Sequence, residues 1–242
     1  MIYIILFIII IIILYFCANQ FLFSKKEAFC TDKKTLNNLR KLLFTFDQIA
    51  KDNNLLYWAD SGTLLGSLRH GDIIPWDDDA DVVILEKDEQ KLLNLKEEFK
   101  KYDIGISKFW GGYRIFFNKG DMIHSENRNW DWDDGTKEVF DYKYPFIDIF
   151  SMKYFDDENI YHYSNDKVKE LYKDYYYNHD ELFPLNRTSF AYFYINTPNK
   201  PHNFLNRAYG NDWKVIAYKM YDHQNMQFLD NQKFNVNDVK CE

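Results

Sequence analysis

The chain has 242 residues, a length that leaves room for one membrane segment and one domain of ordinary size and that excludes two large domains. Hydrophobic residues make up 46% of the chain and charged residues 28%, a composition typical of a folded globular protein. The formal net charge is -7 and no long run of Lys and Arg is present, so we expect no nucleic-acid partner. A small anionic substrate is compatible with this charge if a bound cation offsets the acidic groups.

The first residues are predicted to form a membrane segment. Residues 2–18 contain no charged side chain, and with the apolar residues that follow they approach the roughly 20 residues that span a bilayer. A cleaved signal peptide is the alternative, but a basic start and a small-residue cleavage site are missing. We therefore expect a single-pass anchor in the lipid bilayer at 1–24, a linker and helix at 25–54, and a catalytic domain at 55–242.

The sequence leaves open on which side of the membrane the domain lies. Several lysines follow the apolar stretch and none precedes it, a pattern that favours the cytoplasm. Cys30 and Cys241 lie near the two ends of the remaining chain. They are compatible with a disulfide in an oxidising lumen, and equally with two free thiols.

Hydrophobic periodicity predicts the elements that follow the anchor. Apolar residues at helical spacing indicate an amphipathic helix at 33–51 that covers a sheet. A short buried strand is predicted at 55–59, and a brief helix at 63–69 follows a Gly-containing turn. The β-branched residues at 82–85 indicate a second buried strand.

The remainder of the domain is predicted to alternate strands and helices. Residues 118–143 form a polar stretch that is too long for a simple connection. Strands mixed with helices at unequal spacing predict an α/β (α+β) domain, with a mixed sheet and flanking helices. The predicted elements are, in order, a helix at 87–100, a hairpin with strands at 104–109 and 113–117, a strand at 144–150, a hairpin at 152–163 and a helix at 166–177.

An acidic run at 76–81 carries the strongest chemical signal. In an extended chain, side chains alternate between two faces, so Asp77, Asp79 and Asp81 are predicted to project to one side. Asp78 is predicted to project to the other side. Carboxylates this close repel one another, and a divalent cation such as Mg²⁺ (or Mn²⁺) relieves the repulsion. The alternative is a solvated acidic loop, but the apolar residues on both sides of the run argue against it.

A Gly-containing turn lies just before this run and is predicted to open a short helix. The free N–H groups and the dipole at a helix start favour a phosphate group, so we expect this turn to bind phosphate. A packing role for Gly66, and a purely local role for the basic residues at the helix end, are the alternatives. The predicted phosphate-binding residues are Ser61, Gly62, Thr63, Gly66 and Arg69, with His70 as a further substrate contact.

A third acidic position lies within an apolar strand. An unpaired charge there would be costly, so Asp148 is predicted to face a site, either as a metal ligand or as the base that takes a proton from an attacking hydroxyl. The alternative is a hydrogen-bonded structural carboxylate. Arg114 and Arg207 are candidate substrate contacts, although surface or ion-pairing roles are the simpler reading of each.

Four segments together resemble the LicD family, which includes bacterial phosphocholine transferases and the fukutin group of animals. The resemblance covers roughly residues 55–213. It rests on Gly-Thr-Leu-Leu-Gly-Ser-Leu-Arg-His-Gly at 62–71, Ile-Pro-Trp-Asp-Asp-Asp-Ala-Asp at 74–81, Phe-Ile-Asp-Ile-Phe at 146–150 and Arg-Ala-Tyr-Gly-Asn-Asp-Trp at 207–213.

The resemblance implies a nucleotidyltransferase-like fold in which a Gly-containing turn and an Asp-x-Asp pair bind a metal ion and a nucleotide-activated donor. Characterised members move phosphocholine or ribitol phosphate from a CDP-linked donor onto a glycan hydroxyl. On that pattern Asp79 and Asp81 match the metal pair, Asp77 supports them, and Asp148 matches the third acidic position. Ala80 departs from the pattern, because a larger apolar residue is usual there. The resemblance also favours the lumen of the secretory pathway.

We therefore expect a metal-dependent phosphotransferase with Asp79, Asp81 and Asp148 as its catalytic residues and Asp77, Asp79 and Asp81 as its metal ligands. Two alternatives are kept. The first is a nucleotidyltransferase, which would transfer a nucleoside monophosphate. The second is a non-catalytic protein, associated with glycans or membranes, that retains a vestigial site.

Overall fold

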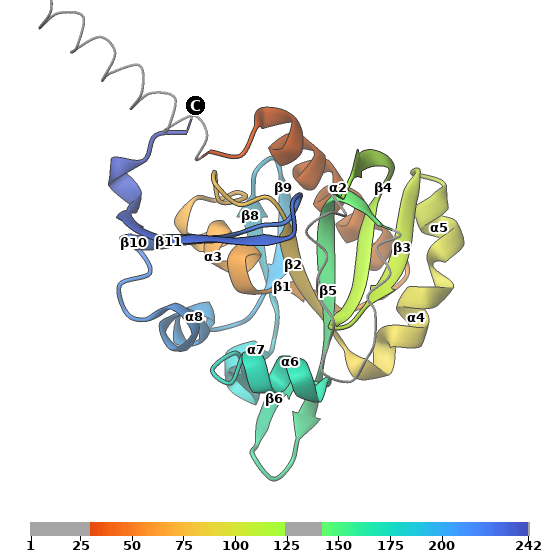
Figure 1. The fold of residues 1–242 in the computed structure, drawn as a ribbon. Helices are drawn as coiled ribbons and strands as arrows, with labels where there is room; N and C mark the ends of the chain where they lie inside the picture. Colours follow the sequence, from red (N-terminus) through yellow and green to blue (C-terminus); the bar gives the residue numbers. More distant parts are fainter. Residues whose placement is uncertain (1–29, 124–141, 242) are drawn as a thin grey trace, which may run out of the picture.

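The computed structural model describes residues 30–123 and 142–241, and a mixed sheet lies at its centre (Figure 1). The strand order is β1-β2-β5-β4-β3, with β6 paired to β5 and β7 paired to β6. The strands β2 and β5 are parallel, and the other pairs are antiparallel. The bounds are β1 Tyr57–Ala59, β2 Ala80–Leu85, β3 Ile104–Phe109, β4 Gly112–Met122, β5 Lys143–Phe155, β6 Ile160–Tyr163 and β7 Tyr177–Asn178.

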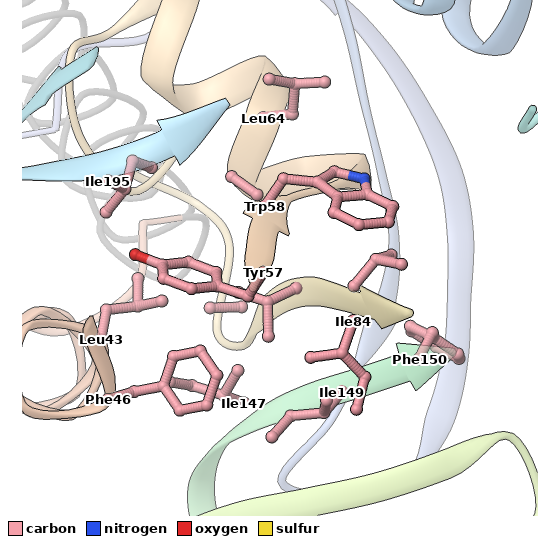
Figure 2. Close-up of a cluster of buried hydrophobic side chains, with 14 of the residues drawn as sticks. Leu43, Phe46, Tyr57, Trp58, Leu64, Ile84, Ile147, Ile149, Phe150 and Ile195 are labelled. Atoms are coloured by element: carbon pink, nitrogen blue, oxygen red, sulfur yellow. The ribbon is translucent and has the colours of Figure 1, made fainter. Parts of the chain in front are cut away.

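The first described helix, α2 (Lys33–Asp52), covers the sheet as its periodicity predicts. The Asp32 side chain accepts a hydrogen bond from the Thr35 N–H and caps the helix start. The apolar face of α2 is buried, and the Phe46 ring lies edge-on to Tyr57 of β1 with centroids 4.9 Å apart. Figure 2 shows Phe46 beside Ile147 of β5 as well, so α2 packs on the centre of the sheet.

Two predicted helices are shorter in the structure than the periodicity indicates. The helix expected at 87–100 divides into η1 (Glu86–Asp88), α4 (Glu89–Asn94) and α5 (Lys96–Lys100), because the Leu95 N–H bonds to the Leu92 carbonyl in a tighter turn. The helix expected at 166–177 ends as α6 (Asp166–Leu171). It is shorter because Tyr177 joins the sheet in β7, where its hydroxyl reaches a buried carboxylate.

The C-terminal half contains elements that periodicity did not predict. Two hairpins lie outside the main sheet, and the dark blue β10–β11 hairpin extends across the face of the molecule in front of α3 (Figure 1). These elements are α7 His179–Leu182, β8 Asn186–Phe190, β9 Phe193–Thr197, α8 Pro201–Tyr209, β10 Ile216–Asp222, β11 Gln227–Asn235 and η3 Val236–Asp238. The helix α3 (Ser61–Arg69) lies in the N-terminal half, where a helix is predicted at 63–69.

The two ends of the described chain are joined by a disulfide. Cys30 and Cys241 are bonded, with their Cα atoms 5.7 Å apart. The sequence left open a disulfide or two free thiols, and the structure has the disulfide. Across 30–123 and 142–241, no helix is both long enough and apolar enough to cross a bilayer. The predicted anchor at 1–24 lies outside the described residues.

Candidate metal centre

Strand register brings the acidic residues of the predicted site together. Asp81 on β2 is the register partner of Asp148 on β5, which is in turn the partner of Arg114 on β4. Residues in register on neighbouring strands project from the same face of a sheet, so the three form one row. Asp79 precedes β2, and carboxylate oxygens of Asp79, Asp81 and Asp148 all lie within 4.8 Å of one another.

Burial makes this cluster electrostatically unfavourable without a counter-charge. Burial first, and then the neighbouring carboxylates, raise the pKa of Asp79 and of Asp81 well above the ordinary range. Hard divalent cations are held by convergent carboxylate oxygens of this kind. The residues present therefore fit a Mg²⁺ or Mn²⁺ ion, with Asp79, Asp81 and Asp148 as the groups that could hold it.

Asp77 lies beside this cluster, next to the start of α3. A Cβ atom at Gly62 would be 2.7 Å from Asp77 Oδ2 and 3.6 Å from Asp81 Oδ2, so the glycine leaves the space that these carboxylates occupy. Burial, together with the charge of Asp78, raises the pKa of Asp77 to about 6. The three residues whose oxygens converge include Asp148, which the sequence predicts as a catalytic residue, and the predicted ligand Asp77 lies next to them.

The start of α3 shapes the cluster through its side chains and its backbone. The Thr63 hydroxyl accepts a hydrogen bond of 2.8 Å from the Asp81 N–H and so fixes the start of β2. Ser61 has a φ of 44°, which is unusual for a residue with a side chain, and its hydroxyl donates to Asp60. A Cβ at Gly66 would lie 2.5 Å from the backbone carbonyl of Asp72, so Gly66 serves close packing.

Asp60, which the sequence analysis did not single out, anchors the turn before α3. Its side chain is fully buried and accepts hydrogen bonds of 2.6 Å from the hydroxyls of Tyr163 and Tyr177. Its N–H donates to the Asp81 carbonyl. Burial raises the pKa of Asp60, and the two tyrosines partly offset that effect. The signal in the sequence is only a single Asp beside the Gly-containing turn.

Arg114 supports Asp148 and is itself enclosed by aromatic rings. Its Nε and Nη2 atoms donate to the two carboxylate oxygens of Asp148 at 2.6 and 3.2 Å. The guanidinium carbon lies 4.2 to 4.4 Å from the ring centroids of Phe109, Tyr142 and Phe146. The structure therefore places Arg114 between the aromatic rings and Asp148, where it is the ion-pair partner of that carboxylate.

Of the other predicted basic contacts, Arg69 and Arg207 form hydrogen bonds that link C-terminal elements to α3 and α7. Arg69 donates from Nη1 to the Trp213 carbonyl at 2.7 Å, and burial lowers the pKa of Arg69 to about 10. Burial, with the charge of Arg69, lowers the pKa of His70 to about 4, so this ring is neutral near pH 7. Arg207 donates to Glu181 from both Nη1 and Nη2, and none of its described hydrogen-bond partners belongs to the acidic cluster.

A histidine from the β10–β11 hairpin completes the surroundings of the cluster. His223 Nδ1 lies 2.6 Å from Asp78 Oδ1, and Nε2 lies 3.1 Å from Asp79 Oδ2. Burial would lower the pKa of His223, but Asp79 and Asp78 raise it to about 10. Asp78 contacts this ring, and ligand atoms of Asp78, Asp79 and His223 form a second group within 4.8 Å of one another. His223 belongs to no sequence motif, so only the tertiary structure identifies it.

Two cavities lie next to the acidic run. One, of about 210 Å³, reaches from Gly62, Asp77 and His223 to the aromatic side chains Trp76 and Trp213. The other, of about 670 Å³, is more polar and open. Its lining includes Asp78, Tyr144, Lys219, Asp222 and Gln232. Asp77 lines the smaller cavity and Asp78 the larger one, whereas Asp79, Asp81 and Asp148 belong to neither lining.

The fold and the site together define a class of protein. A mixed sheet with flanking helices, and a Gly-containing helix start beside an acidic strand, are features of a nucleotidyltransferase-like domain. The chain belongs to the LicD family, because residues 54–200 match the family described as LicD/FKTN/FKRP, nucleotidyltransferase domain.

The chain is also similar to two uncharacterized proteins. The chain is 28% identical over 200 residues to the uncharacterized protein RP689 of Rickettsia prowazekii, covering 82% of this chain and 64% of the relative. It is 31% identical over 206 residues to the uncharacterized protein RT0683 of Rickettsia typhi, covering 83% of this chain and 54% of the relative. The chain thus spans between about half and two thirds of the length of these relatives.

A short segment is more similar to an animal protein. Over 32 residues the chain is 59% identical to ribitol 5-phosphate transferase FKRP of Homo sapiens, which is 13% of this chain and 6% of the relative. Among solved structures, the antibiotic-resistance factor ANT(2'')-Ia matches with 12% identity and a TM-score of 0.39 over 65% of this chain and 63% of that one. The lincosamide antibiotic adenylyltransferase LnuA matches with 17% identity and a TM-score of 0.37 over 68% and 83%. Likenesses this distant add nothing to the family assignment.

Proposed function

We propose that this protein is a metal-dependent phosphotransferase that moves a phospho-substituent, of the phosphocholine or polyol phosphate type, from a CDP-linked donor to a glycan hydroxyl. The observation that carries the proposal is the convergence of Asp79, Asp81 and Asp148 within 4.8 Å in a buried setting. Membership of the LicD family supports the same class of reaction. The short match to a ribitol 5-phosphate transferase favours a polyol phosphate among the possible groups.

Each acidic residue has a proposed task. Asp79, Asp81 and Asp148 would hold Mg²⁺ or Mn²⁺, and Asp77 would stabilise their arrangement beside Gly62. A bound divalent cation supplies charge neutralisation for a pyrophosphate and for the charge that develops as its bond breaks. Both oxygens of Asp148 already accept hydrogen bonds from Arg114, so we assign Asp148 to metal binding and not to proton abstraction.

In the proposed reaction, the acceptor oxygen forms a bond to the phosphorus of the transferred group. The bond between that phosphorus and the oxygen of the nucleoside monophosphate breaks, the hydroxyl proton leaves to solvent or a base, and CMP is released. In-line displacement requires that attacking and leaving oxygens lie on opposite sides of the phosphorus. We assign the two substrates to the cavities of about 210 and 670 Å³ next to the acidic run.

The start of α3 is the proposed position of the donor phosphates. Gly62 lines the smaller cavity next to Asp77. The first N–H groups of a helix are unsatisfied by the helix itself and favour an anionic group. Ser61 and Thr63 complete this turn, whereas Gly66 packs against backbone one helical turn further on.

The test is a transfer assay with the full-length chain, Mg²⁺ and a panel of CDP-linked donors. Asp81→Asn keeps the size of the side chain but removes one charge from the cluster, so we expect folding to be retained and transfer to fall by roughly a thousandfold. Asp156→Asn changes an exposed carboxylate in a turn and is the matched control. Unchanged turnover in Asp81→Asn would refute the assignment.

The product of this assay also separates the alternatives. Release of CMP from a CDP-linked donor identifies phospho-substituent transfer. Release of pyrophosphate from a nucleoside triphosphate would instead identify nucleotidyl transfer, the activity that the description of the family's domain also permits. A wild-type chain that binds no Mg²⁺ in calorimetry would favour the non-catalytic alternative.

We further propose that the domain lies in an oxidising compartment, attached through the predicted anchor at 1–24. The Cys30–Cys241 disulfide supports this placement, since such bonds persist outside reducing compartments. The lysines after the apolar stretch favour the opposite side, and a bond that joins the two ends of the domain is the stronger of the two signals.

A further inference from the structure

The converging aspartates differ in how they are supported. Asp148 is held at both oxygens by Arg114, whose guanidinium is enclosed by aromatic rings. Asp79 sits before β2, where no strand partner restrains it. Among the described residues outside the acidic run, the side chain within hydrogen-bonding distance of the Asp79 carboxylate is the imidazole of His223. A ligand that must point at a metal ion needs such a partner, because carboxylates rotate readily.

We propose that His223 is a positioning residue that orients the Asp79 carboxylate toward a bound metal ion, with Asp78 fixing the imidazole ring. This inference rests on the proposed function. The ring bridges the two carboxylates, with Nδ1 2.6 Å from Asp78 Oδ1 and Nε2 3.1 Å from Asp79 Oδ2. One oxygen of Asp79 is thereby engaged, which leaves the rest of its carboxylate for the cluster.

Asp78 is well suited to fix the ring because it contacts His223 twice. Its Oδ2 accepts a hydrogen bond of 3.0 Å from the His223 N–H, while its Oδ1 faces the ring nitrogen. The Tyr144 hydroxyl donates to the same carboxylate at 3.3 Å. The imidazole also lies edge-on to Phe146 and Tyr221, with centroids 5.8 and 4.8 Å away. The ring therefore has one defined orientation.

His223 lies in a part of the chain that the family match does not cover. The family match ends at residue 200, whereas His223 follows β10 in the C-terminal hairpin. A segment outside the matched domain thus reaches back to the metal ligands. The same hairpin precedes Cys241, whose disulfide to Cys30 fastens this end of the chain. Asp78, the second acidic residue of the run, then serves to dock the hairpin at the site.

The experiment measures the affinity of the full-length chain for Mg²⁺ alone by isothermal titration calorimetry, well below the unfolding temperature. We expect His223→Ala to weaken Mg²⁺ binding by about 10- to 100-fold, the usual effect of removing a partner of a metal ligand. His223→Gln retains an amide donor and should recover part of the loss. Gln227→Ala, an exposed change on the same hairpin, should bind as the wild type does.

Unchanged or tighter binding in a folded His223→Ala variant would overturn the proposal, and tighter binding would show that the ring competes with the metal ion. If that variant does not fold, Asp78→Asn decides the question, because it keeps the imidazole but removes the carboxylate that orients it. Weaker binding is again expected, and unchanged binding overturns the proposal. A wild-type chain that binds no Mg²⁺ contradicts the proposed function instead, whereas binding that is lost in Asp81→Asn but kept in His223→Ala contradicts only this inference.

Discussion

Arg114 and Asp148 are register partners on β4 and β5 and form a bidentate ion pair, with Nε donating to one carboxylate oxygen at 2.6 Å and Nη2 to the other at 3.2 Å. Both side chains are almost fully buried, at 6% and 8% exposure. The guanidinium lies between aromatic rings on one side and the acidic cluster on the other. The pair therefore links the core of the sheet to the candidate metal centre.

Loss of Arg114 should destabilise the fold. Arg114→Met leaves Asp148 buried without its charge partner, and breaking a buried pair in this way costs about 3–5 kcal/mol. Urea unfolding in the absence of metal measures the loss. The double variant Arg114→Met with Asp148→Asn removes the orphaned charge and should recover a large part of the stability. A single variant that loses less than about 1 kcal/mol would contradict the role given to this pair.

The two glycines of α3 should respond differently to alanine. At Gly66 the added Cβ would meet the Asp72 backbone carbonyl at 2.5 Å, so we expect Gly66→Ala to cost about 1–3 kcal/mol in urea unfolding. At Gly62 it would meet Asp77 Oδ2, the far end of a side chain, at 2.7 Å. Gly62→Ala should therefore change stability little and weaken Mg²⁺ binding about tenfold. Equal effects of the two changes on both measurements would refute this distinction.

Glu181 should make stability depend on pH. Burial raises the pKa of Glu181, but hydrogen bonds from Arg207 and Asn203 outweigh burial and lower it. The folded chain thus binds the proton of the Glu181 carboxyl group less tightly than the unfolded chain does. The stabilisation is complete above the unfolded pKa of about 4.3 and is lost as the pH falls through the lower folded pKa.

Urea unfolding of Glu181→Gln checks this expectation. At pH 7 the variant should be less stable than the wild type by about 1–3 kcal/mol, because Arg207 loses a charged acceptor. At a pH below the folded pKa the difference should disappear. Asp180→Asn, on the same short helix but fully exposed, is the control and should show little change. A difference between Glu181→Gln and wild type that stays constant with pH would contradict the assignment.

The disulfide should stabilise the domain and hold its C-terminal segment. Cys30 and Cys241 are 211 residues apart, and a bond that closes so long a loop contributes about 2–5 kcal/mol by restricting the unfolded chain. The paired variant Cys30→Ser with Cys241→Ser should lose about that amount. Alkylation of thiols in cells, followed by non-reducing electrophoresis, checks the compartment, because free thiols in the wild-type chain would contradict an oxidising location.

Local patterns were sufficient to predict much of the sheet. The helix α2 and the strands β2 and β3 are confirmed near their predicted bounds, since each buries a face whose period is visible in the sequence. The hairpin of β3 and β4 is also confirmed, but β4 continues to Met122, beyond its predicted end at 117. Periodicity failed where a distant partner decided the outcome. Tyr177 belongs to a helical pattern but lies in β7, because its hydroxyl donates to the buried Asp60.

In the candidate site, too, local sequence patterns predicted some residues, and only the tertiary structure identified the others. Alternation along an extended chain placed Asp79 and Asp81 on one side, and an apolar strand marked Asp148 as a residue that faces a site. Arg114 and His223 carry no comparable local signal. Their roles depend on strand register and on a hairpin that returns from the C-terminal end of the chain.

The sequence by itself determined the family, the mixed sheet and the carboxylates that are candidates for metal binding, because these follow from residue spacing within short segments. The tertiary structure alone decided which groups surround each carboxylate. It set Asp148 in register with Asp81, and placed His223 between Asp78 and Asp79. A carboxylate's chemistry depends on its burial and on the charges within a few ångströms, and residues far apart in the sequence supply both.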